Sequence, residues 1–295
     1  THVCKYKNNK NMKKLLLLVA SSLMLTATTT NAQSVKAYKN GNATDYTASS
    51  LKQGDLSTVD SIVATGTWTN QDIENLSSSF TTGMFSDNTN LKNADFSNAV
   101  FTANSLSSLF YHCKALKSVV LPNTVKTDGI SLGSAFSMCV ELESIKNLDK
   151  LQNITNMYCA FQYCKKISSI TLPNVTNNNE VSFQSTFSEC NSLLNIDNLD
   201  KFTNITCISS MFYDCHMLKS ATFSNVVNSN EMDAYCTFYW CDSLKTLTNF
   251  EKFTGITSMV YSFYGCKKIN EILNLENIPF DEKAIEEISR MAQGG

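Results

Sequence analysis

Apolar side chains along this chain recur as one repeated block rather than as the mixed pattern of separate globular domains. The block is a phenylalanine, two residues, a cysteine, two residues, and then a leucine or isoleucine. Its seven full copies begin at Phe110, Phe136, Phe161, Phe187, Phe212, Phe238 and Phe263. A degenerate first copy begins at Phe85 and carries Asn88 at the cysteine position. From Phe110 the copies lie 26 and 25 residues apart in alternation, which chance does not produce.

The residues after each cysteine have the alternating pattern of a short β-strand. In residues 116–121, Val119 and Leu121 fall on one side of the strand, and Ser118 and Val120 fall on the other. The stretch before each phenylalanine is predicted to be a helical turn or an irregular return. One coil of about 25 residues cannot bury its apolar side chains alone, so stacked coils with a shared interior are predicted.

The alternating spacing predicts a repeating unit of two coils and 51 residues. One coil of each unit carries an acid followed by a lysine, at Asp149-Lys150, Asp200-Lys201 and Glu251-Lys252. The other coil carries Leu121-Pro122-Asn123, Leu172-Pro173-Asn174 or Phe223-Ser224-Asn225. The sequence therefore predicts an α/β repeat fold, a solenoid of about eight coils of 25–26 residues over residues 85–278.

Both ends of a solenoid expose its interior, so the flanking segments are predicted to close it. Residues 57–84 are predicted to be an N-terminal cap in which a helix begins near Thr69. Residues 279–295 are predicted to form a C-terminal capping helix, because acids and then an apolar stripe follow Pro279. Residues 33–56 are polar and lack periodicity, so a loose polar leader is predicted there.

The start of the chain has the parts of a cleavable export signal. Met12-Lys13-Lys14 is basic, Leu15–Leu25 is an apolar run too short to span a membrane, and small residues end at Ala32. We therefore predict a signal peptide over residues 12–32, cleavage before Gln33, and no retained transmembrane span. Residues 1–11 precede Met12 and are interpreted as an upstream extension of the gene start.

Together these features resemble the BspA-like leucine-rich repeat proteins of bacteria. The resemblance rests on the Ala-Phe-x-x-Cys-x-x-Leu block at residues 135–142 and its copies, on the Leu-Pro-Asn segments, and on the segments flanking the repeats. It covers about residues 57–294. It implies a leucine-rich-repeat solenoid in a secreted or cell-surface protein that acts in adhesion or binds an extracellular or host protein. We expect the chain to be a monomer.

The charge of the chain argues against a nucleic-acid partner. Of the 24 basic residues, five lie in residues 1–32, which contain no acid, so cleavage leaves 19 basic residues against 26 acidic ones. A phosphate backbone needs a basic stripe, and none is expected on so acidic a chain.

The 11 cysteines could form disulfides, bind metal or occupy buried structural positions. Seven share one register, and in stacked coils their Cβ directions would be parallel, which is poor geometry for bridging. Asn88 occupies the same register, so an inward ladder that satisfies turn amides is favoured. Cys159, Cys207 and Cys236 lack the spacing of a zinc site and are interpreted as buried small residues.

No catalytic site, cofactor or metal is expected. Beyond the export signal the only histidines are His112 and His216, about four coils and on the order of 20 Å apart, too far to share a metal or a nucleophile. A cysteine in an apolar column is a poor nucleophile because burial raises its pKa. The acid-lysine pairs recur every 51 residues, whereas a catalytic dyad needs a unique site.

Two columns of outward side chains are candidates for a binding surface. The first follows the predicted strands and contains Val120, Lys146, Thr171, Asp197, Thr222 and Thr248. The second is an aromatic row between the inward Phe and Cys and contains Tyr111, Tyr163, Tyr213, Tyr239, Trp240 and Tyr264. Tyr and Trp are favoured at protein interfaces, and they also stack on sugars, so a protein ligand is expected and a glycan is the alternative. Both columns also have a structural interpretation, as solvent-tolerant strand residues and as rings that shield the core edge.

Overall fold

The computed structural model describes residues 33–47, 56–70, 72, 84–125, 129–173 and 179–268, and positions 282, 285, 286 and 289. The predicted signal peptide and upstream extension lie outside the described residues, as do most of the two predicted capping helices. Positions 70 and 72 of the first and the four isolated positions of the second are helical. The first helix starts at Thr69 as expected, where the backbone N–H and the hydroxyl both donate to Asp72 Oδ2, at 2.8 and 2.6 Å.

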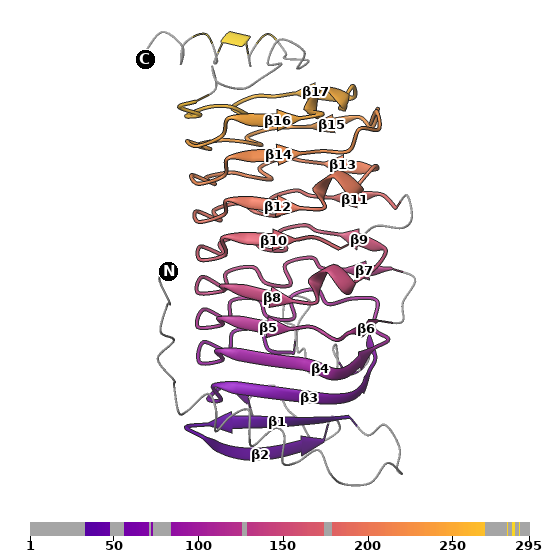
Figure 1. Ribbon diagram of the computed structural model, residues 1–295, viewed down its shortest axis with the longest axis vertical. Helices are drawn as coiled ribbons and strands as arrows, with labels where there is room; N and C mark the ends of the chain where they lie inside the picture. The colour runs from indigo at the N-terminus through magenta and orange to yellow at the C-terminus, as the bar shows by residue number, and fades with distance from the viewer. Residues whose placement is uncertain are drawn as a thin grey trace, which may run out of the picture. The chain divides into compact units, whose positions relative to one another are not determined.

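The repeats form stacked coils whose strands lie in two columns, here called the first and second ladders (Figure 1). Their hydrogen bonds divide them into one seven-stranded sheet and five two-stranded sheets. The first ladder contains β3 (Ser61–Trp68), β4 (Asn93–Phe101), β5 (Ser118–Val120), β8 (Ser144–Lys146), β10 (Ser169–Thr171), β12 (Asn195–Asp197), β14 (Ser220–Thr222) and β16 (Thr246–Thr248). The second contains β6 (Thr124–Val125), β7 (Ile130–Ser131), β9 (Ile154–Asn156), β11 (Val181–Ser182), β13 (Ile205–Cys207), β15 (Met232–Asp233) and β17 (Ile256–Ser258). The predicted repeat solenoid is therefore confirmed.

The solenoid is built from strands and turns, with little helix. Within the described part of residues 84–268 the helical segments are three 3-10 helices, η2 (Leu148–Lys150), η3 (Leu199–Lys201) and η4 (Phe250–Lys252). The stretches before each phenylalanine are hydrogen-bonded turns rather than helical turns. The α component expected of the repeat is thus reduced to one short 3-10 helix at each acid-lysine pair.

A hairpin precedes the solenoid and extends its first sheet. β1 (Ser34–Lys39) and β2 (Asn42–Thr47) pair antiparallel, and β1 also pairs antiparallel with β3. Asn40 and Gly41 connect them with positive φ angles of 51° and 82°, the conformation of a tight hairpin turn. Val35, on the inward side of β1, is fully buried. The loose leader predicted over residues 33–56 is therefore wrong for residues 34–47, because an Asn-Gly turn and alternating apolar side chains are enough to pair this polar segment.

The two-coil unit is visible in the strand pairing. β5 pairs with β8, β10 with β12, and β14 with β16, all parallel and in register. An asparagine in the left-handed conformation follows the second strand of each pair, and its Nδ2 donates to a carbonyl at the end of the first strand. These bonds run from Asn147 to Leu121, from Asn198 to Leu172 and from Asn249 to Phe223, at 2.8, 2.9 and 3.1 Å. The asparagines therefore tie the two coils of a unit together.

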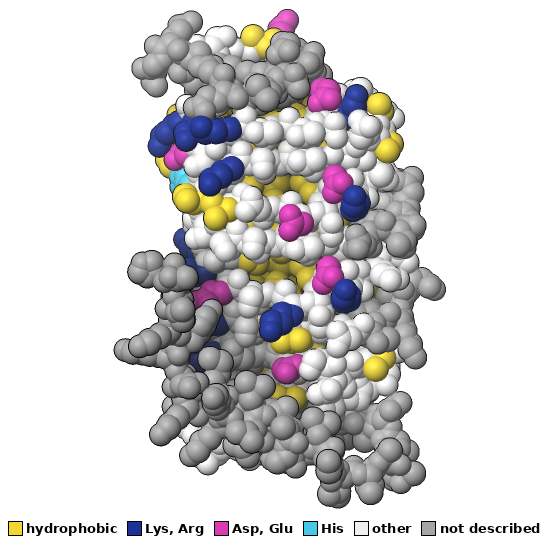
Figure 2. All heavy atoms as spheres, in the orientation of Figure 1, with side chains coloured by type: hydrophobic (Ala, Val, Ile, Leu, Met, Phe, Trp, Pro, Cys, Tyr) yellow, Lys and Arg dark blue, Asp and Glu magenta, His cyan; other side chains and the backbone are white. Residues whose placement is uncertain are grey.

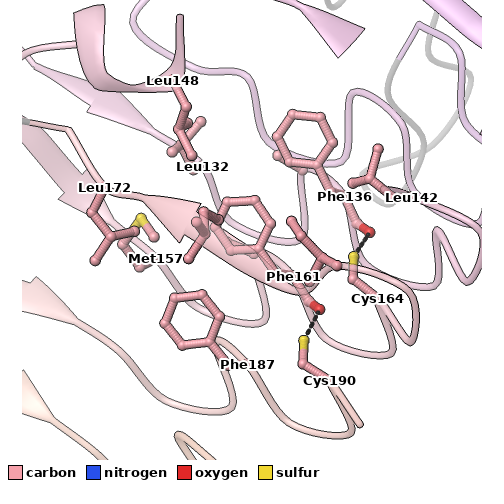
Figure 3. Packing of buried hydrophobic residues seen from close by; sticks show 14 of the residues in the cluster. Leu132, Phe136, Leu142, Leu148, Met157, Phe161, Cys164, Leu172, Phe187 and Cys190 are labelled. Carbon is pink, nitrogen blue, oxygen red and sulfur yellow. Dashed lines mark hydrogen bonds between the residues drawn. The ribbon is translucent and has the colours of Figure 1, made fainter. Parts of the chain in front are cut away.

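The phenylalanines of the repeat form one continuous stack in the core (Figure 3). Consecutive rings from Phe85 to Phe263 have centroids 5.3 to 5.6 Å apart and interplanar angles of 4° to 24°. All eight rings are buried. Full burial of an aromatic side chain of this size stabilises a fold by about 2–3 kcal/mol, so this column is a major source of cohesion between coils.

The column cysteines lie beside the phenylalanines and are buried. Each thiol donates to the backbone carbonyl of the phenylalanine in the preceding coil, at 2.8 to 3.1 Å, as Cys164 and Cys190 do in Figure 3. Asn88 donates in the same direction, to the carbonyl of Leu56, and its Oδ1 accepts the N–H of Leu91 at 3.0 Å. The inward ladder is confirmed, with the correction that the thiols bond to carbonyls rather than to turn amides.

Candidate binding surfaces

The structure brings the predicted strand column onto one face of the first ladder. Val120 is opposite Lys146, Thr171 is opposite Asp197, and Thr222 is opposite Thr248 in the strand registers. Val120 is half-buried, and the other five side chains are exposed. Figure 2 shows this face as mostly uncharged, with scattered acidic and basic side chains and hydrophobic atoms visible between coils. The column is therefore accessible and carries both a basic and an acidic side chain. Within it, the Thr171 hydroxyl donates a hydrogen bond to Asp197 Oδ2 at 3.3 Å.

The predicted aromatic row proves to be two rows with different backbone conformations. Tyr111, Tyr213, Tyr239 and Tyr264 directly follow the stacked phenylalanines. Tyr163 and Trp240 lie one residue further along, where φ is +62° and +55°. All six side chains are partly or well exposed, as the sequence predicted.

Only part of that row is brought together. The rings of Tyr213 and Tyr239 stack at 4.8 Å with an interplanar angle of 2°, and those of Tyr239 and Tyr264 at 5.1 Å and 15°. Trp240 stacks beside Tyr239 at 5.8 Å and 14°. Tyr111 and Tyr163 lie in earlier coils and have no ring contact with this group among the described residues.

Two further tyrosines complete this group, and sequence reasoning missed them. Tyr235 meets Tyr261 edge to face at 6.0 Å, and Tyr261 meets Tyr264 in the same way at 6.1 Å. Tyr235 and Tyr261 each precede a stacked phenylalanine, in the stretch predicted to be a helical turn or an irregular return. A signal was present, because Tyr158 and Tyr235 both lie three residues before a stacked phenylalanine. We call Tyr213, Tyr235, Tyr239, Trp240, Tyr261 and Tyr264 the aromatic cluster.

The aromatic cluster is exposed, and its position is fixed by the backbone beneath it. The exposed fractions of Tyr235, Trp240, Tyr261 and Tyr264 are 44, 45, 42 and 42%. The indole of Trp240 lies on Gly265, where a Cβ would overlap the ring. Gly265 has a φ of +75° and occupies the turn position that Trp240 holds in the coil before. A glycine at this position therefore makes room for the indole to pack flat.

A chain of polar contacts runs along one side of the aromatic cluster. Asn191 Nδ2 donates to Asp214 Oδ2 at 3.0 Å, and His216 Nε2 lies 3.0 Å from Asp214 Oδ1. His216 Nδ1 lies 3.2 Å from Asp242 Oδ2 without making a well-directed hydrogen bond. Lys267 Nζ donates to the same Asp242 oxygen at 3.1 Å. The carboxylates of Asp214 and Asp242 are thus held next to the rings.

Nearby carboxylates help to raise the pKa values of two tyrosines, Tyr213 and Tyr163. The pKa of Tyr213 is raised by partial burial, by Asp214, by Cys236 and by Glu189. The pKa of Tyr163 is raised first by its hydrogen bond to Glu189. In both cases a neighbouring carboxylate adds to the effect of burial.

Most of the described cysteines are buried, and both described histidines contact aspartates. Burial raises the pKa of the Cys113 and Cys266 thiols to about 12, so neither is a thiolate near neutral pH. His112 Nδ1 contacts Asp87 Oδ1 at 2.6 Å, and His216 belongs to the polar chain described above. Among the described residues, no group of three His, Cys, Asp or Glu could hold a metal ion.

In the part of the chain that the structure describes, no helix has both the length and the apolar character needed to cross a membrane.

Comparison with known proteins gives a matching family and a distant likeness to solved structures. The model of the BspA type leucine rich repeat region matches in six copies over residues 64–129, 132–270 and 230–288, fewer than the eight coils predicted from the spacing. The chain is also similar to one from the "Structure of the Toll - Spatzle complex, a molecular hub in Drosophila development and innate immunity", with 18% identity and a TM-score of 0.30. That likeness covers 54% of this chain and only 23% of the other. None of the curated proteins gives a significant match.

Proposed function

The chain belongs to the BspA-type leucine-rich repeat family, and from that premise we propose that it is an exported binding protein that mediates protein–protein interaction or adhesion. It is secreted or held at the bacterial surface, and its ligand is an extracellular or host protein. The observation that carries the proposal is the aromatic cluster, in which six large side chains from three consecutive coils share one exposed surface. Monomeric soluble proteins rarely expose such groups together unless they bind something.

The orientation of the rings favours a protein over a glycan. A sugar binds an aromatic side chain by lying against an open ring face. Tyr239 has Tyr213 stacked on one face and Tyr264 on the other, so neither face is open. The stack offers ring edges and phenol hydroxyls instead, which suit an irregular surface of apolar and hydrogen-bonding groups. Tyr and Trp side chains of this kind dominate the binding energy of protein interfaces.

Export and the absence of catalysis are parts of the same proposal. The basic, apolar and small-residue segments over residues 12–32 support a cleaved signal, and the remaining chain is acidic. The thiols of the cysteine column are protonated and engaged in hydrogen bonds, which supports a structural role for them rather than a nucleophilic one.

The test is direct binding of the purified full chain to a panel of purified extracellular matrix proteins and to a glycan array. We expect saturable binding to at least one protein, weakened about tenfold by Tyr239→Ala, the loss typical of an interface aromatic residue. The matched control is Tyr158→Ala, because Tyr158 is a 45% exposed tyrosine, more exposed than the partly buried Tyr239, and has no ring contact among the described residues. Binding to glycans alone, or equal losses in the two variants, would contradict the proposal.

A further inference from the structure

One coil of the solenoid already holds a lysine against an aromatic ring. Lys165 Nζ lies 5.8 Å from the centroid of the Tyr163 ring. The same ammonium group lies 3.9 Å from Glu189 Oε2, in the next coil. The ring quadrupole and the carboxylate both attract the cation. This triplet is an internal example of how the turn face can hold a cation.

The coil that carries Trp240 has the same ring position with a different neighbour. Tyr163 and Trp240 both lie two residues after a stacked phenylalanine and share the left-handed conformation. The residue after the column cysteine is Lys165 in the first coil and Asp242 in the second. Here the coil therefore presents a carboxylate beside the ring where the earlier coil presents an ammonium group.

The carboxylates near Trp240 already have partners, and the most exposed of these partners is Lys267. Lys267 contacts Asp242, but its side chain is 74% exposed, so its ion pair contributes little. Asp214 contacts His216, whose ring lies 6.2 Å from the indole. Both carboxylates thus contact a histidine whose ring neighbours the exposed indole.

We propose that Trp240, with Asp242 and Asp214, binds a lysine or arginine side chain from an exposed basic segment of the partner protein. This inference rests on the proposed function and names the chemistry of the partner at the same surface. The partner side chain lies against the indole and pairs with Asp242, as Lys165 lies against Tyr163 and pairs with Glu189. The acidic balance of the chain beyond residue 32 attracts such a segment over a longer range.

The experiment measures binding of fluorescently labelled hexalysine and hexaarginine amides to the full chain by anisotropy at low salt. We expect Trp240→Ala and Asp242→Asn each to weaken binding about fivefold or more. Asp149→Asn is the matched control, because it makes the same charge change at an exposed acid in η2. We expect it to change affinity less than about twofold. We expect Lys267→Ala to strengthen binding by up to about fivefold, because it removes a competing exposed cation.

Two further measurements make the result decisive. In the wild type, peptide binding should shift the emission of Trp240, since Trp68, the other tryptophan, is only 1% exposed. A hexamer of acetylated lysine should not bind. Equal losses for Asp149→Asn and Asp242→Asn, or equal binding of the acetylated peptide, would overturn the inference. If Asp242→Asn leaves peptide binding unchanged while Tyr239→Ala still weakens capture of a matrix protein about tenfold, the cation site is refuted and the proposed function stands.

Discussion

Removal of one column thiol tests how the coils are held together. In Cys190→Ala, the thiol is replaced at a fully buried position where Sγ donates to the Phe161 carbonyl at 3.0 Å. That carbonyl also accepts the N–H of Cys164 at 3.0 Å, so it keeps one partner after the substitution. The change therefore removes a weak S–H hydrogen bond and leaves a cavity of about one sulfur atom.

The expected magnitude follows from these two losses. A weak hydrogen bond to an acceptor that keeps another donor is worth about 0.5 kcal/mol. A cavity of methyl size costs about 1 kcal/mol. Together they predict a loss of about 1.5 kcal/mol in the free energy of unfolding, confined to the coils around Cys190 because a solenoid couples mainly to its neighbours.

Urea unfolding followed by far-ultraviolet circular dichroism, in reducing buffer at neutral pH, measures this loss. Cys207→Ala is the matched control, because Cys207 is partly exposed and lies outside the column. We expect it to change the free energy of unfolding by less than about 0.5 kcal/mol. A similar small change for Cys190→Ala would refute a cohesive role for the thiol column. A loss above about 3 kcal/mol would show that the carbonyl is left without a donor.

Four further predictions concern the thiols, one asparagine and export. In the native protein at pH 8, iodoacetamide should modify Cys207 and spare the column cysteines, whose pKa values burial raises; peptide mass spectrometry checks this. The column thiols stay protonated in the folded protein, whereas the thiols of the unfolded chain ionise above their ordinary pKa of 9.0. Their contribution to the free energy of unfolding should therefore be fully present below pH 9 and decrease as the pH rises beyond it, and thermal melts measure this decrease. Asn198→Ala should lower the free energy of unfolding by about 2 kcal/mol, since it loses the bond to Leu172 and strains a φ of +67°, whereas Asn198→Gly should lose about 1 kcal/mol. N-terminal sequencing of exported protein should find Gln33 first, and an intact residue 12 would refute cleavage.

The N-terminal segment contained stronger local signals for β-strands than its polar composition suggests. The polarity of residues 42–47 hides their strand, because five of these six side chains are exposed and only the backbone pairs. Asn40-Gly41 between two short segments was the available signal for the hairpin. The segment that it joins is held mainly by Val35 and Ala37, two small apolar side chains in an otherwise polar stretch.

The period of the chain was sufficient to predict the core. A phenylalanine and a cysteine at fixed offsets must stack on their copies when coils are piled, because each apolar side chain needs a neighbour from the next coil to be buried. The burial of Phe85, Asn88 and their copies follows from that requirement alone. The same regularity predicted which side chains of the strands and turns point outward.

The binding surface depended on tertiary structure, because the sequence does not say which outward side chains are neighbours. A left-handed turn lets the ring of Trp240 stack beside that of its neighbour Tyr239, and the piling of coils brings Tyr264 to Tyr239 from 25 residues away. Tyr235 and Tyr261 join them through turns whose direction no periodicity predicts. The sequence therefore determined the column of buried residues, where repetition and burial act together. The exposed aromatic cluster could be identified only from the folded structure. Solvent imposes no sequence pattern on outward positions, so the backbone conformation alone sets which of them are in contact.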